Sequence, residues 1–123
     1  MNRTRKTPIG KLRLKLDKAW AKAVKERDNN LCRICQVPGL NVDAHHIFPR
    51  TRLSTRFLPS NGLTMCRLCH TMYHSRTSNY LRDVVRSKIG RHIFDVLEKR
   101  SRVIIHSPTR EWYEEQLRSL NER

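Results

Sequence analysis

Acidic side chains are scarce in this sequence. The chain of 123 residues has 11 Asp and Glu against 26 Lys and Arg, which gives a net charge of +15. Between Ala44 and Arg82 there is no acidic residue at all. So large a positive charge favours a polyanionic partner, and nucleic acid is the partner that we expect. A basic surface that only keeps the protein soluble is the alternative, and the uneven distribution of the charge argues against it.

Long hydrophobic runs are also missing. No segment approaches the roughly 18 apolar residues of a membrane span. The start, "MNRTRKTPIGKLRLK", lacks the apolar region of a signal peptide. We therefore expect no membrane partner and a cytoplasmic location. A chain of 123 residues has room for one domain with one modest core.

Cysteines are few, and their spacing is regular. The four form two CxxC pairs, Cys32 with Cys35 and Cys66 with Cys69. Structural disulfides are rare in the cytoplasm, and a redox-active CxxC would stand in a βαβ pattern, which neither pair has. Two CxxC pairs can instead supply the four thiolates of a tetrahedral structural zinc site. Because thirty residues separate Cys35 from Cys66, we expect further structure between the two halves of the site.

The hydrophobic pattern divides the chain into three parts. We expect residues 1–14 to form a basic N-terminal arm, and residues 15–123 to form a single domain that begins with a helix in "KLDKAWAKAVKERD". Residues 31–75 lose the helical period, which predicts short strands, turns and a final helix. Residues 78–123 regain the helical period, which predicts three helices. The first lies in "NYLRDVVRSKIG" and ends at Gly90, and the second lies in "RHIFDVLEKR". The third lies in "SPTREWYEEQLRSL", with Ser107 as N-cap and Pro108 at the first helical position. We expect these three helices to serve as packing elements in an α+β fold.

Four histidines accompany the cysteines. His45 and His46 are adjacent in "VDAHHIFPR". His70 and His74 are four residues apart on the predicted helix, so their imidazoles can share one metal ion. The acid-free stretch around them could hold a phosphate without repulsion, because it contains Arg50, Arg52, Arg56, Arg67, Arg76 and Arg82. Arg50, Arg52 and Arg56 are the candidate DNA contacts, with ordinary solvated charges as the alternative.

From Leu31 to Ser75 the sequence resembles the HNH endonucleases, a family with a ββα-metal motif. The stretches "CRIC", "DAHHIFP", "SNGLTMCRLCH" and "MYHS" follow the family's order and are close to its spacing. The resemblance implies a small zinc-stapled ββα-metal core with metal-dependent cleavage of DNA. By position it implies that His46 is the general base, that Asn61 holds the base and its loop, and that the catalytic metal is bound by His45, His70 and His74.

A looser resemblance extends over more of the chain. The stretches "KERDNNLCRIC", "DAHH", "IG" and "EWYEEQLRSL" look like the NinG (Rap) recombination endonucleases of lambdoid phages, which cut branched DNA. This resemblance implies a phage protein that acts on recombination DNA in the cytoplasm of the host.

The chemistry of phosphodiester hydrolysis fits these roles. The reaction needs a base for the attacking water, and a neutral imidazole such as that of His46 is suitable near pH 7. It also needs positive charge on the phosphoryl and leaving oxygens, which a divalent metal supplies as a Lewis acid. Three imidazoles favour Mn²⁺, Co²⁺, Ni²⁺ or Zn²⁺, and Mg²⁺ becomes workable if water or the Asp43 carboxylate joins the ligands. The alternative role of Asp43 is that of a turn acid or an arginine partner.

Two other functions stay open at this point. A non-catalytic zinc module that only binds DNA would leave the histidines as surface or core residues. A sequence-specific nicking or restriction endonuclease would need an element that enters a groove of the DNA, and no such motif is evident. The sequence also leaves open whether two chains form a homodimer to cut both strands.

Overall fold

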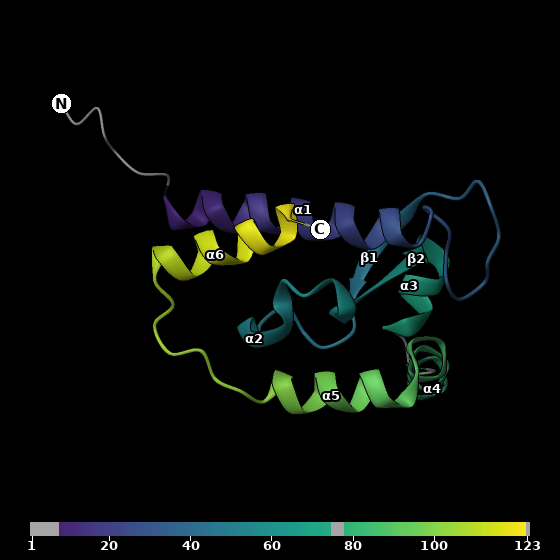
Figure 1. The fold of residues 1–123 in the computed structure, drawn as a ribbon. Coiled ribbons are helices and arrows are strands. Elements are labelled where there is room, and N and C mark those ends of the chain that lie inside the picture. The colour runs from purple at the N-terminus through teal and green to yellow at the C-terminus, as the bar shows by residue number, and fades with distance from the viewer. Residues whose placement is uncertain (1–7, 75–77, 123) are drawn as a thin grey trace.

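The computed structural model describes residues 8–74 and 78–122. Within them, one long helix precedes two strands, and a series of shorter helices follows (Figure 1). The elements are α1 (Ile9–Arg27), β1 (Val42–His46), α2 (Leu53–Arg56), a 3₁₀ helix η1 (Pro59–Asn61), β2 (Gly62–Cys66), α3 (Arg67–Tyr73), α4 (Ser78–Ile89), α5 (Arg91–Ser101) and α6 (Arg110–Asn121). None of these helices is both long and apolar enough to cross a membrane.

The two strands divide the interior into two buried clusters. β1 and β2 pair antiparallel, from Val42 opposite Cys66 to His46 opposite Gly62. One cluster joins β2 to α3, α4 and α5, and the other joins α1 to α6. Figure 1 shows α1 and α6 side by side along one edge of the molecule and α5 at the opposite edge. This arrangement confirms the α+β fold, and the order β1, β2, α3 is a ββα unit.

Helix α1 begins at Ile9, directly after Pro8, and not near residue 15 as the pattern predicted. Leu12 is buried with the α6 residues, so the apolar face of the helix extends further toward the N-terminus than expected. It continues the four-residue spacing of the other buried residues of α1, which are Leu16, Trp20 and Val24. The helix therefore includes Lys11 and Arg13 of the predicted arm, and residues 1–7 of that arm lie outside the described residues.

The C-terminal helices form near their predicted positions. Gly90, at φ 93°, ends α4 and precedes α5, a conformation that favours glycine. The prediction of Ser107 as the N-cap of α6 is wrong. Thr109 is the cap, and its Oγ1 atom accepts a hydrogen bond from the backbone N–H of Trp112 over 3.1 Å. Thr109 has extended backbone angles, as an N-cap requires, whereas Ser107 has a φ of 45° and lies further out in the linker.

A close approach of β2 to α1 fixes the position of the strand pair. A Cβ atom at Gly62 would lie 2.3 Å from the Cγ2 atom of Val24 and 2.8 Å from the Cζ2 atom of Trp20. Only glycine leaves room for both side chains at this point. Because Gly62 pairs with His46 across the sheet, the same contact brings the His46 position of β1 next to α1.

Candidate active site and metal centres

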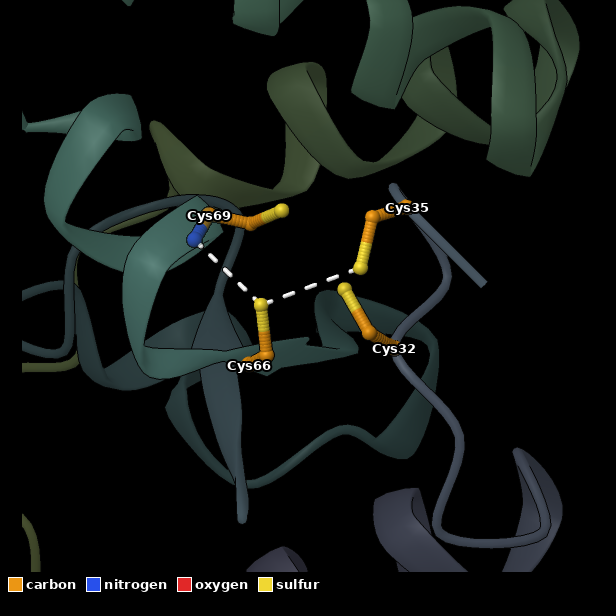
Figure 2. Close-up of side chains that lie close together, drawn as sticks. All are labelled: Cys32, Cys35, Cys66 and Cys69. Carbon is orange, nitrogen blue, oxygen red and sulfur yellow. Dashed lines mark hydrogen bonds between the residues drawn. The ribbon is translucent and has the colours of Figure 1, made fainter. Parts of the chain in front are cut away.

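Four cysteines meet where the end of β2 approaches the turn after α1. Cys32 and Cys35 lie in that turn, Cys66 ends β2, and Cys69 lies in the first turn of α3. Their sulfur atoms are within 4.8 Å of one another, and the Sγ atoms of Cys35 and Cys66 are 3.8 Å apart (Figure 2). Tetrahedral Zn–S bonds of about 2.3 Å would separate two sulfurs by about 3.8 Å. The four thiols could therefore hold a structural zinc ion.

Backbone N–H groups point at sulfur atoms of this cluster and favour the thiolate form of Cys32. The N–H of Cys69 donates to the Sγ atom of Cys66 over 3.4 Å (Figure 2). Burial tends to raise the pKa of Cys32, but the backbone N–H groups of Cys35, Cys66 and Ile34 lower this pKa to about 6. Burial and the neighbouring thiols raise the pKa of Cys69. The four thiols would therefore need a cation between them to ionise together, which fits a zinc ion.

Asp28 connects the cysteine turn to the sheet. Its side chain is 1 % exposed and accepts hydrogen bonds from Arg27, from Arg33 and from the backbone N–H of Thr64 in β2. Burial tends to raise the pKa of this carboxyl, but the hydrogen bonds from Arg27 and Thr64 hold it below its ordinary value. Arg33 stands between the first two cysteines, so Asp28 fixes their turn against β2. Asp28 was not among the predicted site residues, and its position between Arg27 and Arg33 is the sequence signal that points to it.

Three histidines meet on the side of β1 that faces α3. The ring centroid of His45 is 4.9 Å from that of His70 and 5.5 Å from that of His74. One ring nitrogen from each lies within 4.8 Å of the other two. His45 is 3 % exposed, and its Nε2 atom is buried with no hydrogen-bond partner among the described residues. A buried polar atom without a partner is costly, and a metal ion held by the three rings would satisfy it.

The surroundings of His45 and His70 favour the unprotonated form of these two rings. Burial, together with the nearby imidazoles of His70, His74 and His46, lowers the pKa of His45 to about 3. Burial and His74 also lower the pKa of His70, and the charge of Asp43 opposes them. A neutral imidazole has a lone pair for a metal, so His45 and His70 suit a divalent ion, and His74 lies close enough to share it. Asp43 is exposed, and its carboxylate lies outside the group of three ligand atoms.

His46 leaves β1 on the opposite side from His45, as successive residues of a strand do. Its ring stacks on that of Trp20, with the centroids 3.8 Å apart and an angle of 8° between the planes. Its Nε2 atom lies 3.1 Å from the backbone oxygen of Arg56. Burial lowers the pKa of His46 to about 4, against the opposing effect of that hydrogen bond. The ring is thus neutral near pH 7, and because a carbonyl only accepts, Nε2 carries the hydrogen and Nδ1 keeps a free lone pair.

Asn61 holds the segment that follows β1. It is completely buried, and its side chain accepts a hydrogen bond from the Phe48 N–H at 2.9 Å and donates one to the Phe48 oxygen at 3.1 Å. Its backbone oxygen accepts a third bond, from the N–H of Ile47 at 2.9 Å. These bonds fix the two residues directly after His46. The described contacts of Asn61 are therefore with the loop rather than with the imidazole itself.

A cavity of about 900 Å³ opens beside these histidines, and all four of them line it. Helices α4 and α5, which pack in the core as expected, also contribute to its wall. The arginines that line the cavity are Arg50, Arg52, Arg82 and Arg102, and α5 adds Phe94 and Glu98. Arg52 donates to the Oγ atom of Ser101 over 2.9 Å, which ties the loop after β1 to α5. The tertiary packing of α4 and α5 places the charged residues Arg82 and Glu98 at this cavity, and their spacing in the sequence does not predict this position.

Arg56 does not fit the predicted role of a DNA contact. Its side chain is 12 % exposed and makes two hydrogen bonds to the carboxylate of Asp17 in α1, at 3.2 and 2.8 Å. The Nε and Nη2 atoms of the guanidinium are thus turned toward α1, and its Nη1 atom donates to the backbone oxygen of Arg50 over 3.5 Å. The backbone oxygen of the same residue is the partner of His46. Arg56 therefore supports the site from within the fold, whereas Arg50 and Arg52 are exposed at the cavity.

A family of known proteins matches part of this chain. Residues 32–77 match the model of a family described as HNH endonuclease, in agreement with the resemblance over the cysteines and histidines. No curated protein and no solved structure matched the chain.

Proposed function

We propose that this chain, whose residues 32–77 match the HNH endonuclease family, is an active metal-dependent endonuclease that hydrolyses the phosphodiester bonds of DNA. An endonuclease domain implies DNA as the substrate. One observation carries the proposal of activity. A single cavity is lined both by three histidines that can share a divalent ion and by His46, whose Nδ1 atom has no hydrogen-bond partner among the described residues. A domain that only binds DNA has no need of either feature.

His46 is the general base in this proposal. The carbonyl of Arg56 holds the hydrogen on Nε2, and the stacked ring of Trp20 fixes the plane of the imidazole. Nδ1 then accepts a proton from the attacking water. Asn61 is a positioning residue, since it holds the loop that starts directly after the base. Arg50 and Arg52 are the proposed contacts to DNA phosphates.

The histidines His45, His70 and His74 would hold the catalytic divalent ion. The buried Nε2 atom of His45 supports this assignment, because it has no other described partner. The ion would supply Lewis-acid charge for a phosphoryl oxygen and for the departing 3′ oxygen. Three imidazoles favour Mn²⁺, Co²⁺, Ni²⁺ or Zn²⁺, and Mg²⁺ would need additional oxygen ligands. Asp43, exposed on the same strand, could supply such oxygen only after a rearrangement of its side chain.

The metal dependence of cleavage tests this proposal. Supercoiled plasmid should be cut by the zinc-loaded protein when Mn²⁺ or Mg²⁺ is added. The His70→Ala variant should need a metal concentration at least about tenfold higher for half-maximal rate, because even loss of an outer partner of a metal ligand typically lowers affinity 10–100-fold. His92→Ala, at an exposed position of α5 outside the cavity lining, is the matched control and should behave as the wild type. If the wild type binds DNA but cuts none at any metal concentration, the chain is a non-catalytic binding module.

The substrate that we propose is branched DNA. Arginines and lysines hold phosphates, which are alike in every sequence, so selectivity would come from DNA shape and deformability. A junction or flap is already unstacked at the branch and would enter the cavity at a lower deformation cost than a stiff duplex. The looser resemblance to phage recombination endonucleases points the same way, and a phage origin and action in the host cytoplasm belong to this proposal.

We therefore expect a four-way junction to be cut several-fold faster than a linear duplex of matched sequence. The cuts should move with the branch point when the surrounding sequence is changed, and gel mapping of end-labelled strands measures this. Cuts that remain at one sequence on linear duplex would favour the sequence-specific nicking or restriction enzyme instead. Paired cuts on opposite strands at a rate that rises steeply with protein concentration would indicate a homodimer.

A further inference from the structure

The outer face of α1 carries a row of lysines that the proposed active site does not use. They are spaced alternately by four and three residues, which places them on one face of the helix. Lys25 is partly exposed and the other four are exposed. We name this row the lysine stripe: Lys11, Lys15, Lys18, Lys22 and Lys25.

The lysine stripe points away from the proposed active site. Lys18 and Lys22 are each two residues from Trp20, and residues two apart on a helix lie on nearly opposite sides. Trp20 is 2 % exposed and faces the sheet, so the stripe faces solvent on the far side of α1. The described residues that line the cavity include none from α1. In Figure 1, α1 forms one edge of the molecule, whereas α5, which lines the cavity, forms the other.

The charge of the lysine stripe is largely uncompensated by α1 itself. This helix contains two acidic residues, Asp17 and Glu26. Asp17 is bound by Arg56 on the other side of the helix. Glu26 lies 3.7 Å from Lys22, in a pair whose side chains are 77 % and 63 % exposed, so solvent screens it strongly. Helix α1 thus offers five lysines and one screened acid along this face, which complements a polyanion.

We propose that the lysine stripe binds the phosphate backbone of a second double-stranded DNA segment, distinct from the segment in the cavity. This inference rests on the proposed function, because it assumes that DNA occupies the cavity. The stripe extends over fourteen residue steps, about 21 Å along the helix, and so offers contacts to several phosphates. A straight duplex passes along only one side of a protein this small. The segment on the stripe is therefore another arm of a branched molecule, and the protein holds two arms at once.

The test compares two variants that each lose three positive charges. The first is Lys15→Gln, Lys18→Gln, Lys22→Gln, in the stripe. The second is Lys88→Gln, Arg91→Gln, Lys99→Gln, at exposed positions of α4 and α5 outside the cavity lining. Glutamine is a good helix former, so both variants should fold. Binding to a labelled four-way junction is measured by fluorescence polarisation over a range of salt concentrations, on zinc-loaded protein without added catalytic metal.

The stripe variant should bind the junction on the order of tenfold more weakly at about 0.1 M salt. A plot of the logarithm of the association constant against the logarithm of the salt concentration has a negative slope, and this slope should become less steep by roughly 2 to 3 units. The other variant should lose much less affinity. Cleavage of saturating DNA in Mn²⁺ should keep the wild-type rate in both variants. Equal losses of affinity in the two variants, or none in either, would overturn the inference. Binding is measured without cleavage. A wild-type protein that cuts no DNA would therefore contradict the proposed nuclease activity, while the affinities of the two variants would still test the lysine stripe.

Discussion

The Cys66→Ser variant should contain no zinc and should not fold. The apparent free energy of structural zinc binding is about 10–16 kcal/mol in small zinc domains, which is comparable to the roughly 5–15 kcal/mol that stabilises a typical protein. The cysteine cluster joins the turn after α1 to β2 and α3, so loss of the ion separates three elements of the core. Metal analysis and circular dichroism of the purified variant measure both effects.

Cys35→Ser is the matched control for this result. Cys35 is exposed whereas Cys66 is 3 % exposed, so the hydroxyl at position 35 creates no buried polar group. Loss of folding in both variants would therefore come from loss of zinc rather than from a misplaced hydroxyl. Folded wild-type protein with four reactive thiols and no zinc would contradict this account of the cluster.

The His46→Ala variant should cut DNA slower than the wild type by on the order of 100-fold or more, while zinc content and DNA affinity stay nearly unchanged. The substitution removes the proposed proton acceptor and leaves the three proposed metal ligands in place. Because His46 packs against Trp20, the alanine also opens a gap beside α1. Single-turnover cleavage, with thermal unfolding of the same sample, separates the loss of chemistry from a loss of stability.

Two further variants test whether the slow cleavage comes from loss of the proton acceptor. His46→Asn keeps a planar side chain with an N–H donor for the Arg56 oxygen but has no group that takes a proton near pH 7, so it should be as slow as the alanine variant. His106→Ala removes an exposed histidine from the linker between α5 and α6 and should cut at the wild-type rate. Cleavage by His46→Asn at the wild-type rate would place the base at another residue.

Local spacing accounts for what the sequence predicted well. Each CxxC pair places two thiols close together within one turn of the chain, and the four-residue step from His70 to His74 does the same for two imidazoles. In the structure the four cysteines form one group, and the two histidines form another with His45. The resemblance to HNH endonucleases added the order of strands and helix between them. The periodic apolar positions likewise placed the C-terminal helices, although the cap at Thr109 differed from the predicted one.

Contacts between distant parts of the chain account for what the sequence did not predict. The stacking of His46 on Trp20 depends on how α1 crosses the sheet at Gly62, which no local pattern encodes. The partner of an arginine is likewise a property of tertiary packing. Arg56 looked like its neighbours in the basic stretch, yet it binds Asp17, whereas Arg82 of α4 reaches the cavity.

The chemical nature of the cut ends tests the central claim most directly. Supercoiled plasmid is nicked by the wild-type protein in Mn²⁺, the protein is removed, and DNA ligase is added. Attack of a water activated by His46, with departure of the 3′ oxygen, leaves a 5′-phosphate and a 3′-hydroxyl, so the ligase should reseal the nicks. Nicks that cannot be resealed, or a plasmid that remains uncut with and without the metal, would contradict the account.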